Sequence, residues 1–320
     1  GAQVGGGESA RDWRDGETIV KVLRRSSKAA IWSEAYRRSA LSIGFVPTLG
    51  GLHEGHLSLV RQARLECDRV AVSIYLNPSQ FNSDEDLESY PCDLEADVET
   101  CRAEGVDLVL LGQQEDFFPE NFQSWVLVED LVRELCGAGR PGHFRGVCTV
   151  VTQLFHVLRP HRAYFGLKDF QQAKIVKKLT EELLFDVEIC LMPTIRSQDG
   201  LALSSRNDRL TETQRAAAPA LHEALVDAGS LISSGETSVK AVKELLLSRL
   251  AGVAGCELEY VEVLSAATLG EFPGQVLNTS GEGALVALAV IFEEVRLIDN
   301  IQVQDAGVSD QVESGSEGGS

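Results

Sequence analysis

The sequence predicts an α/β fold: a Rossmann-like, doubly wound, mostly parallel sheet followed by a smaller, lid-type α+β domain. Over residues 18–194, short apolar runs of strand length alternate with helical patterns, and this alternation is typical of parallel sheets built from βαβ units. Over residues 195–303, helical patterns come first and strands of antiparallel type follow, which indicates a separate unit. A chain of 320 residues with 44% hydrophobic residues is long enough to build both cores.

The expected elements follow in chain order. A helical pattern from about residue 18 leads to the first strand at 43–46, and a helix from about His56 is followed by a second strand at 70–76. The rest of the first domain is predicted as a helix to about residue 104, a strand at 106–111, a helix at 147–158, a strand at 163–166, a helix at 170–184 and a strand at 187–191. The second domain is predicted as helices at 212–228, closed by Gly229, and at 238–251, then strands at 258–263 and 284–292.

Both ends of the chain, residues 1–17 and 304–320, are rich in glycine and in charged or small polar residues. They show no hydrophobic periodicity, so we expect both to be disordered. The fold is therefore assigned to residues 18–303.

Composition argues against several classes of protein. A net charge of −19 at pH 7 disfavours a broad nucleic-acid surface, which needs a basic face, so we expect no nucleic-acid partner. The apolar runs are shorter than the roughly 18 residues of a membrane span, and we expect no membrane association. Seven scattered cysteines without a C-x-x-C pair are typical of reduced thiols, so we expect a cytoplasmic protein.

Residues 41–60 read LSIGFVPTLGGLHEGHLSLV, a strand, a glycine loop and the start of a helix. Glycine lets the backbone come close to a ligand, and the first turn of a helix offers free N–H groups and a positive dipole end to phosphate. His53 and His56 are spaced i, i+3, so both rings can lie on that edge and donate to phosphate oxygens. A protonated imidazole there would offset charge on a leaving pyrophosphate. The stretch therefore predicts a phosphate site.

A single histidine near a helix start is more often a cap or a surface residue. The combination of strand, glycine loop, H-x-G-H and helix favours function, because a motif counts when its structural context matches. The pattern is neither G-x-x-x-x-G-K-[ST] nor G-x-G-x-x-G, which argues against a P-loop or a dinucleotide site. It resembles the H-x-G-H signature of the adenylyl-transferring α/β superfamily, which includes nucleotidylyltransferases and class I aminoacyl-tRNA synthetases.

Three further segments carry polar side chains at the expected ligand edge. The segment NPSQF, residues 77–81, follows the second strand, where open α/β sheets place ligands. In YFGLKDFQQ, residues 164–172, Lys168 can meet a phosphate and Asp169 a ribose hydroxyl, although a Lys-Asp pair at a helix start is as often a solvated pair. In DGLALSSRN, residues 199–207, two hydroxyls and a guanidinium follow a glycine and predict a second phosphate clamp.

With these segments in order, residues 18–303 resemble the pantothenate synthetase (pantoate–β-alanine ligase) family. The resemblance rests on six segments in the family's order and spacing: PTLGGLHEGH, NPSQF, SYPCDLEAD, GRPGHFRGV, YFGLKDFQQ and DGLALSSRN. It implies a homodimeric ligase that forms a carbon–nitrogen bond between pantoate and β-alanine. It also implies ATP as a substrate, Mg²⁺, a pantoyl-adenylate intermediate, and the release of AMP and pyrophosphate.

The resemblance also implies roles for individual residues. It makes His56 the acid at the phosphates, and His53, Lys168 and Arg206 its catalytic partners. The implied ATP site comprises Thr48, Leu49, Gly50, His53, His56, Gly166, Leu167, Lys168, Asp169, Ile195, Leu203, Ser204, Ser205 and Arg206. The implied substrate site comprises Gln80, Gln172 and Asn77, and Arg140 and His143 match a family segment without an assigned role. No side-chain metal site is implied, since Mg²⁺ would be held mainly by the phosphates of ATP.

The chain departs from the family pattern at four positions. The family usually has Met where Leu49 and Leu203 stand, a change that keeps apolar bulk. It usually has Glu at the positions of Leu167 and Ser197. We expect position 167 to orient Lys168, so that Leu167→Glu would improve catalysis; the alternative is that the position only packs against the sheet.

Two other functions stay open at this point. A plain nucleotidylyltransferase would release the adenylylated compound, but NPSQF, Gln172 and the second domain argue against it. A catalytically silent nucleotide-binding homologue would keep the fold without the reaction. The intact His53, His56 and Lys168 argue against that alternative, whereas Leu167 keeps it open.

Overall fold

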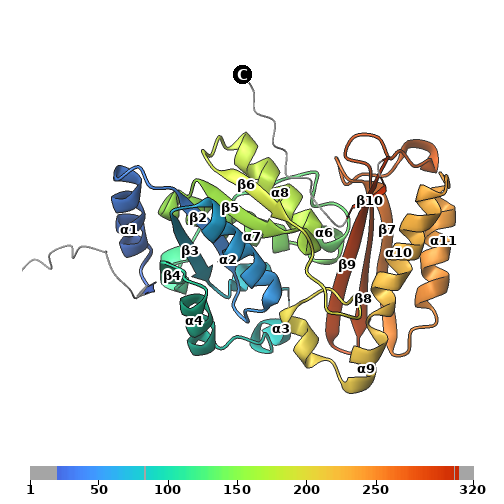
Figure 1. The fold of residues 1–320 in the computed structure, drawn as a ribbon, viewed down its shortest axis with the longest axis horizontal. Helices are drawn as coiled ribbons and strands as arrows, with labels where there is room; N and C mark the ends of the chain where they lie inside the picture. Colours follow the sequence, from blue (N-terminus) through green and yellow to red (C-terminus); the bar gives the residue numbers. More distant parts are fainter. Residues whose placement is uncertain (1–19, 83, 306, 310–320) are drawn as a thin grey trace, which may run out of the picture.

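The computed structural model describes residues 20–82, 84–305 and 307–309. The expected disorder of residues 1–17 lies outside the described residues, as does most of the segment 304–320. Figure 1 shows two lobes side by side: a parallel sheet with helices on both faces, and an antiparallel sheet with helices against one face. The predicted fold class is confirmed.

The sheet of the first domain has six strands in the order β1-β4-β3-β2-β5-β6, and every neighbouring pair is parallel. Its strands are β1 Lys21–Leu23, β2 Ile43–Thr48, β3 Arg69–Ile74, β4 Leu108–Leu111, β5 Arg162–Gly166 and β6 Glu188–Met192. Strands are added on both sides of β2, so a topological switch point lies between β2 and β5. Open α/β sheets bind ligands beyond the carboxyl ends of the strands at such a point.

Helices cover both faces of this sheet because successive strand residues point in opposite directions. Phe45 of β2 packs in one apolar cluster with residues of α1 and α7, whereas the next residue, Val46, packs in another with residues of α2. The helices of the domain are α1 Ser26–Arg38, α2 Glu54–Glu66, η1 Pro78–Gln80, α3 Asp84–Glu88, α4 Leu94–Ala103, α5 Gln114–Phe117, α6 Cys136–Gly139, α7 His143–Leu158, η2 Leu167–Asp169 and α8 Phe170–Glu182.

The second domain has an antiparallel sheet in the order β10-β9-β8-β7, with α10 and α11 packed on one face. Its elements are η3 Ser205–Arg209, α9 Glu212–Ala217, α10 Ala220–Ser233, α11 Val239–Leu250, β7 Cys256–Ser265, η4 Pro273–Gln275, β8 Ala284–Phe292, β9 Val295–Gln304 and β10 Gly307–Ser309. Leu264, Leu285 and Ala287 of the other sheet face form an apolar cluster with Leu135 and Phe170 of the first domain. This cluster joins the two domains.

Two predictions for helices were wrong in their bounds. The helix expected before the first long strand is present as α1, but it begins at Ser26, after the strand β1, because a three-residue edge strand is too short to show a period. The helix predicted over residues 212–228 is two helices that meet at Pro219, which has no N–H with which to continue α9. Gly229 does not close α10. A Cβ there would lie 2.7 Å from Val308 Cγ2, so the glycine allows α10 to pack closely on the sheet.

Besides β1, two strands were missed. β9 is paired with β8 over residues 295–303, but its buried polar residues Asp299 and Asn300 interrupt the apolar pattern that identifies a strand. β10 pairs with β9 inside the segment expected to be disordered. Within the described part of the chain, no helix has the length and apolar character needed to cross a membrane.

Candidate active site

A cavity opens beyond the carboxyl ends of β2, β3 and β5, and the segment that leads into η3 borders it from the second domain. It brings together most of the residues predicted from separate parts of the sequence. The predicted residues that line it are Thr48, Leu49, His53, His56, Gln80, Gly166, Lys168, Asp169, Gln172, Ile195, Leu203, Ser204, Ser205 and Arg206, together with Arg140 and His143. Gly50, Asn77 and Leu167 do not line it.

The backbone amides of the glycine loop are already occupied by a carboxylate. Asp97 of α4, only 5% exposed, accepts hydrogen bonds from Gly51 N and Leu52 N, each at 2.8 Å. The N–H groups of Gly51 and Leu52 are therefore engaged within the protein. The buried carboxylate instead fixes the loop, and side chains remain to meet an anion.

The glycines at positions 50 and 51 are needed for packing within the protein. Both have positive φ, at 99° and 65°, a region that favours glycine. A Cβ on Gly50 would collide with Cys92 Sγ, and one on Gly51 with the carbonyl oxygen of Pro91. These glycines bring the loop against residues 91–92 and do not approach the cavity as predicted, whereas Gly55 lines it.

The two histidines form a reciprocal cap at the start of α2, which begins at Glu54, two residues before the position near His56 that was predicted. The N–H of Gly55 donates to His53 Nδ1 at 3.1 Å, and the N–H of His53 donates to His56 Nδ1 at 3.3 Å. Because each Nδ1 accepts, each neutral ring carries its hydrogen on Nε2. Both rings line the cavity with centroids 4.1 Å apart, so the pair can offer two Nε2–H donors to one ligand.

Both imidazoles are neutral in the free protein. Burial, followed by the charge of Lys168, lowers the pKa of His53 to about 4. Burial, followed by the neighbouring His53, lowers the pKa of His56 to about 3. The sequence suggested a protonated imidazole, but desolvation of this helix start disfavours the cation. The positive charge at this end of the cavity comes from Lys168.

In the NPSQF segment, the side-chain amide of Asn77 binds that of Gln80, and Gln80 lines the cavity. Asn77 is fully buried, and its Nδ2 donates to Gln80 Oε1 at 3.1 Å and to the Gly146 carbonyl oxygen at 3.3 Å. Asn77 Oδ1 accepts from Ser79, so the predicted substrate contact is instead the residue that orients Gln80. Gln80 lines the cavity, and with its Oε1 engaged it has its Nε2–H groups left to donate to a ligand.

Lys168 lines the cavity from η2, with Nζ 3.9 Å from Asp169 Oδ1. Its neighbour Leu167 points elsewhere and packs against the apolar cluster between the domains. The predicted ATP contact by Leu167 is therefore not part of the cavity. The same packing favours the alternative, in which position 167 packs against its surroundings and does not orient Lys168.

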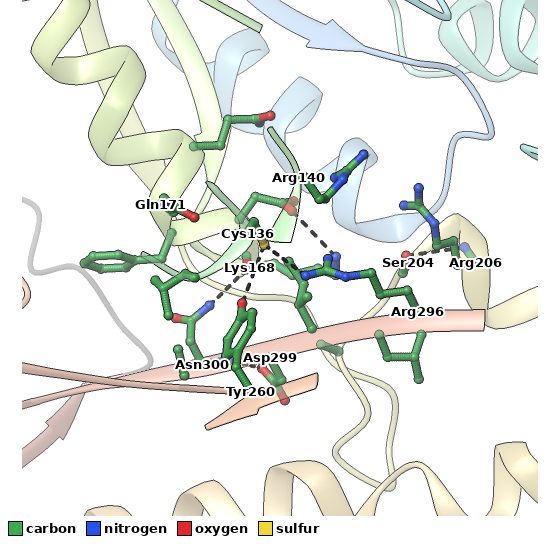
Figure 2. A pocket seen from close by; sticks show the side chains of 18 of the residues that line it. Cys136, Arg140, Lys168, Gln171, Ser204, Arg206, Tyr260, Arg296, Asp299 and Asn300 are labelled. Atoms are coloured by element: carbon green, nitrogen blue, oxygen red, sulfur yellow. Dashed lines mark hydrogen bonds and ion pairs between the residues drawn. The ribbon is translucent and has the colours of Figure 1, made fainter. Parts of the chain in front are cut away.

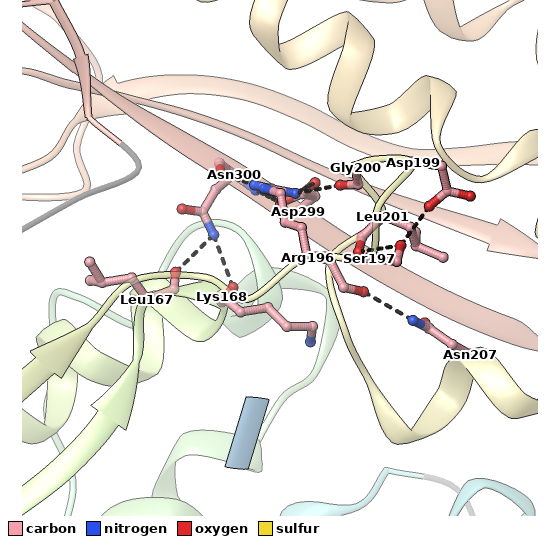
Figure 3. Close-up of polar contacts among 11 residues, drawn as sticks. Leu167, Lys168, Arg196, Ser197, Asp199, Gly200, Leu201, Asn207, Asp299 and Asn300 are labelled. Carbon is pink, nitrogen blue, oxygen red and sulfur yellow. Dashed lines mark hydrogen bonds and ion pairs between the residues drawn. The ribbon is translucent and has the colours of Figure 1, made fainter. Parts of the chain in front are cut away.

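Asn300, on β9 of the second domain, forms hydrogen bonds to the backbone of η2. Its Nδ2 donates to the carbonyl oxygens of Lys168 at 2.9 Å and Leu167 at 3.2 Å, as Figure 3 shows. The preceding residue, Asp299, accepts a two-bond contact from Arg196, at 2.6 and 3.0 Å. Arg196 directly follows Ile195 in the segment that lines the cavity, so β9 anchors both walls.

The hydroxyl and guanidinium groups of η3 meet the first domain on the opposite side. Arg206 pairs with Asp86 of α3 at 2.9 Å and lies over the ring of Tyr90, 5.4 Å from its centroid. Ser205 Oγ donates to the Tyr90 hydroxyl at 3.0 Å. Arg206 thus already has an acid partner, while Ser204 keeps its hydroxyl at the cavity wall, where it accepts from the N–H of Arg206 at 3.3 Å.

Sequence reasoning missed the roles of Asp97, Tyr90 and Asn300, and the buried Ser73. Asp97 and Tyr90 lie in the recognised segment SYPCDLEAD, so the segment was found but their contacts were not. Ser73 is 1% exposed and lines the cavity, and its Oγ has no hydrogen-bond partner among the described residues. A polar pair inside an apolar strand was the available signal for Asn300.

A second cavity lies between the domains. The residues that it shares with the first are Arg140, His143, Lys168, Asp169, Gln172, Ser204 and Arg206. Figure 2 shows that β-strand residues of the second domain, among them Tyr260 and Arg296, form its other wall. The shared residues make the two cavities continuous. Among the described residues, no group of three or more His, Cys, Asp or Glu side chains is placed to hold a metal ion.

Known proteins resemble this chain over most of its length. The family model described as pantoate-beta-alanine ligase matches residues 21–302. The pantothenate synthetase of Moorella thermoacetica is 46% identical over 285 residues, covering 89% of this chain and 99% of the relative, and that of Acetivibrio thermocellus is 45% identical over 265 residues, covering 82% and 92%.

Solved structures of proteins with these same names also resemble this chain. The pantothenate synthetase from Thermus thermophilus superimposes with a TM-score of 0.81 at 38% identity, covering 89% of this chain and 100% of that one. The pantoate-beta-alanine ligase from Francisella tularensis, complexed with beta-gamma ATP and beta-alanine, gives 0.72 at 30% identity, covering 89% and 98%.

Proposed function

This chain belongs to the pantoate–β-alanine ligase family, and we propose that its cavity joins ATP and pantoate into a pantoyl-adenylate that β-alanine then attacks. The observation that carries the proposal is that one cavity unites donors suited to phosphate with donors suited to a hydroxy acid. His53, His56 and Lys168 stand on the phosphate side. Gln80 and Gln172 supply amides on the other.

Each step follows from bonds that must form and break. A carboxylate oxygen of pantoate attacks the α-phosphorus of ATP, and the bond to pyrophosphate breaks. Neutral Nε2–H donors and the Lys168 ammonium stabilise the charge that develops on the leaving oxygens. No side-chain nucleophile is needed, because positioning and charge neutralisation carry phosphoryl-group chemistry.

In the second step, the amine of β-alanine attacks the carbonyl carbon, loses a proton, and AMP leaves. The adenylate reacts with water if the site is open, so the cavity must exclude water. The ion pair Arg206–Asp86 and the Asn300 contacts join the domains on both sides of the cavity. These contacts favour a closed site.

The pantoate side of the cavity combines amides with an apolar wall. Val147, Val150 and Leu154 of α7 line it beside Gln80. Amide N–H groups suit the hydroxyl and carboxylate oxygens of pantoate, and the valines suit its methyl groups. The adenosine side is assigned to Gly166, Asp169 and Ile195.

Mg²⁺ completes the proposed substrate set. It would be held mainly by ATP phosphate oxygens, the ligands that this hard cation prefers, and would neutralise part of their charge. Asp169 lines the phosphate side and offers the kind of oxygen such an ion accepts. We further propose a homodimer that acts in the cytoplasm, which sedimentation of the purified protein and fractionation of the cells test.

The direct test is incubation of the protein with ATP, Mg²⁺, pantoate and β-alanine. Pantothenate and AMP are the expected products, and pantoate alone should support pyrophosphate exchange into ATP. ADP as the main product would overturn the proposal, as would free release of an adenylylated product. Gln80→Ala should raise the KM for pantoate strongly with little change for ATP, and equal effects on both would contradict the assignment of Gln80.

A further inference from the structure

Two arginines, Arg206 and Arg140, line both cavities, and among the described residues only Arg140 of this pair lacks an acid partner. Among the described residues no carboxylate forms an ion pair with it, although it is half-buried and lines both cavities. The other two arginines of the second cavity are paired: Arg206 with Asp86 at 2.9 Å, and Arg296 with Glu259 at 2.6 Å. Arg140 alone among them keeps an uncompensated charge.

Neutral groups hold Arg140 in place. One terminal nitrogen donates to the carbonyl oxygen of Gln80 at 3.2 Å, and the other lies 3.5 Å from His143 Nε2. His143 Nδ1 donates to the same Gln80 carbonyl oxygen at 2.6 Å, and its Nε2 faces an arginine nitrogen that can only donate, so Nε2 is an acceptor and the ring is neutral. Burial, followed by the charge of Arg140, lowers the pKa of His143 to about 4, so this ring adds no charge.

The surroundings of Arg140 favour an anion. Burial is the main cause that lowers its pKa, and the charges of Arg296 and Arg206 lower it further. A guanidinium in this state is stabilised by a carboxylate, which its planar fork can bind through two hydrogen bonds. Figure 2 shows Arg140, Arg296 and Arg206 gathered at the second cavity.

We propose that Arg140 binds the carboxylate of β-alanine and that the second cavity is the chamber for this substrate. The inference rests on the proposed function, in which ATP and pantoate fill the first cavity. Arg140 is fixed by the backbone of Gln80, whose side chain faces pantoate, so a ligand held by Arg140 lies beside the activated carbonyl. Its amine then reaches the carbonyl carbon while its carboxylate stays on the guanidinium.

The proposed site for the β-alanine carboxylate is separate from the proposed phosphate site. The histidines that face the phosphates line the first cavity but not the second, whereas Arg140 lines both. Arg140 should therefore affect the second step and leave the first unchanged. That division makes the proposal testable.

The test is the variant Arg140→Gln, measured in both steps. The KM for β-alanine should rise about 10- to 100-fold, the usual effect of removing hydrogen bonds to a charged group. Pantoate-dependent pyrophosphate exchange and the KM values for ATP and pantoate should stay within about twofold of the wild type. Arg140→Lys, which keeps the charge but loses the fork, should fall between the two.

An amine without a carboxylate provides a second measurement. 3-Aminopropanol should be a poor substrate for the wild type, and the preference for β-alanine over it should collapse in Arg140→Gln. The matched control is Arg133→Gln, because Arg133 lies outside both cavities and its side chain is 70% exposed. This control should leave every constant unchanged.

Three results would overturn the inference. An unchanged KM for β-alanine would place its carboxylate elsewhere. A loss of pyrophosphate exchange, or a rise in the KM for pantoate as large as that for β-alanine, would mean that Arg140 acts on pantoate or only supports Gln80. A wild-type protein that performs exchange but shows no preference for β-alanine would refute this inference alone, whereas a wild-type protein without exchange would refute the proposed function.

Discussion

The side-chain amide of Asn300 donates to the backbone carbonyl of Lys168 at 2.9 Å, so a strand of the second domain holds the turn that carries the cavity's lysine (Figure 3). The two residues lie 132 positions apart in the chain. Domain packing and lysine placement are therefore coupled through one side chain.

Asn300→Ala should remove the coupling between domain packing and the position of Lys168. The carbonyls of Leu167 and Lys168 would lose their donor, and we expect the free energy of unfolding to fall by about 1–3 kcal/mol. A displaced Lys168 should slow adenylate formation by about 10- to 100-fold. Gln302→Ala is the control, because Gln302 lies on the same strand and donates to the Glu282 carbonyl oxygen away from the cavity. Equal rates in the two variants would contradict the coupling.

His56→Ala should slow adenylate formation by about 10²–10³, the usual cost of removing one preorganised donor. The melting temperature should change much less than the rate, since the lost contact is a single bond within the cap. Single-turnover formation of adenylate measures the effect. A turnover number equal to that of the wild type would leave His56 with a structural role only.

The low pKa values of the histidines predict acid sensitivity. The folded protein keeps His56 neutral down to about pH 3 and His53 to about pH 4, whereas the unfolded chain takes up these protons near pH 6.5. The unfolded state therefore binds more protons below pH 6.5, and stability is lost as the pH falls from there toward 4.

His56→Gln should reduce this loss. The melting temperature should fall less between pH 7 and pH 5 in the variant than in the wild type. The comparison uses His156→Gln, at an exposed position of α7, as control. Parallel curves for His56→Gln and the wild type would rule out a buried neutral His56.

Asp97→Ala should loosen the glycine loop. Two amides would lose a charged acceptor, so we expect a loss of about 2–3 kcal/mol in the free energy of unfolding and weaker ATP binding. Glu99→Ala on the same helix is the control, because Glu99 is exposed and, within the described part of the chain, its ion pair is with Arg102 of that helix. Thermal unfolding and ATP titration of both variants decide the matter, and retention of full affinity in Asp97→Ala would exclude a role in shaping the site.

Leu167→Glu should destabilise the protein without a kinetic gain. The new carboxylate would enter the apolar cluster between the domains and lack a partner, at a cost of about 1–3 kcal/mol. Leu65→Glu is the control, since Leu65 is 81% exposed. A faster enzyme at low ionic strength, with unchanged melting temperature, would restore the orienting role that the sequence suggested for this position.

The site loop could be predicted from the sequence because its determinants are local. Within residues 41–60 an apolar run, a proline, glycines and a helical period follow one another, and each acts on its own neighbours. The same holds for NPSQF and for the hydroxyls before η3. Their meeting in one cavity follows from the parallel sheet, which brings the carboxyl ends of its strands to one edge.

The partners of these groups could not be predicted. Asp97 is 46 positions from Gly51, and Asp86 is 120 positions from Arg206. The chain has 48 acidic residues, and no local pattern distinguishes the ones that pair with the loop or with η3. The strand β9 was missed for the same reason. Asp299 and Asn300 break its apolar pattern, and their partners, Arg196 and the backbone of Lys168, are 103 and 132 positions away.

The sequence by itself determined that two imidazoles share one edge of a helix start, since a spacing of three residues fixes this wherever the helix lies. Their charge state was decided by the tertiary structure. Burial of the helix start and the approach of Lys168 from η2, which follows β5, make the cation unfavourable, and the cap fixes the hydrogen on Nε2. Protonation depends on solvent and on neighbouring charges, which are set only when β2, β5 and the second domain come together.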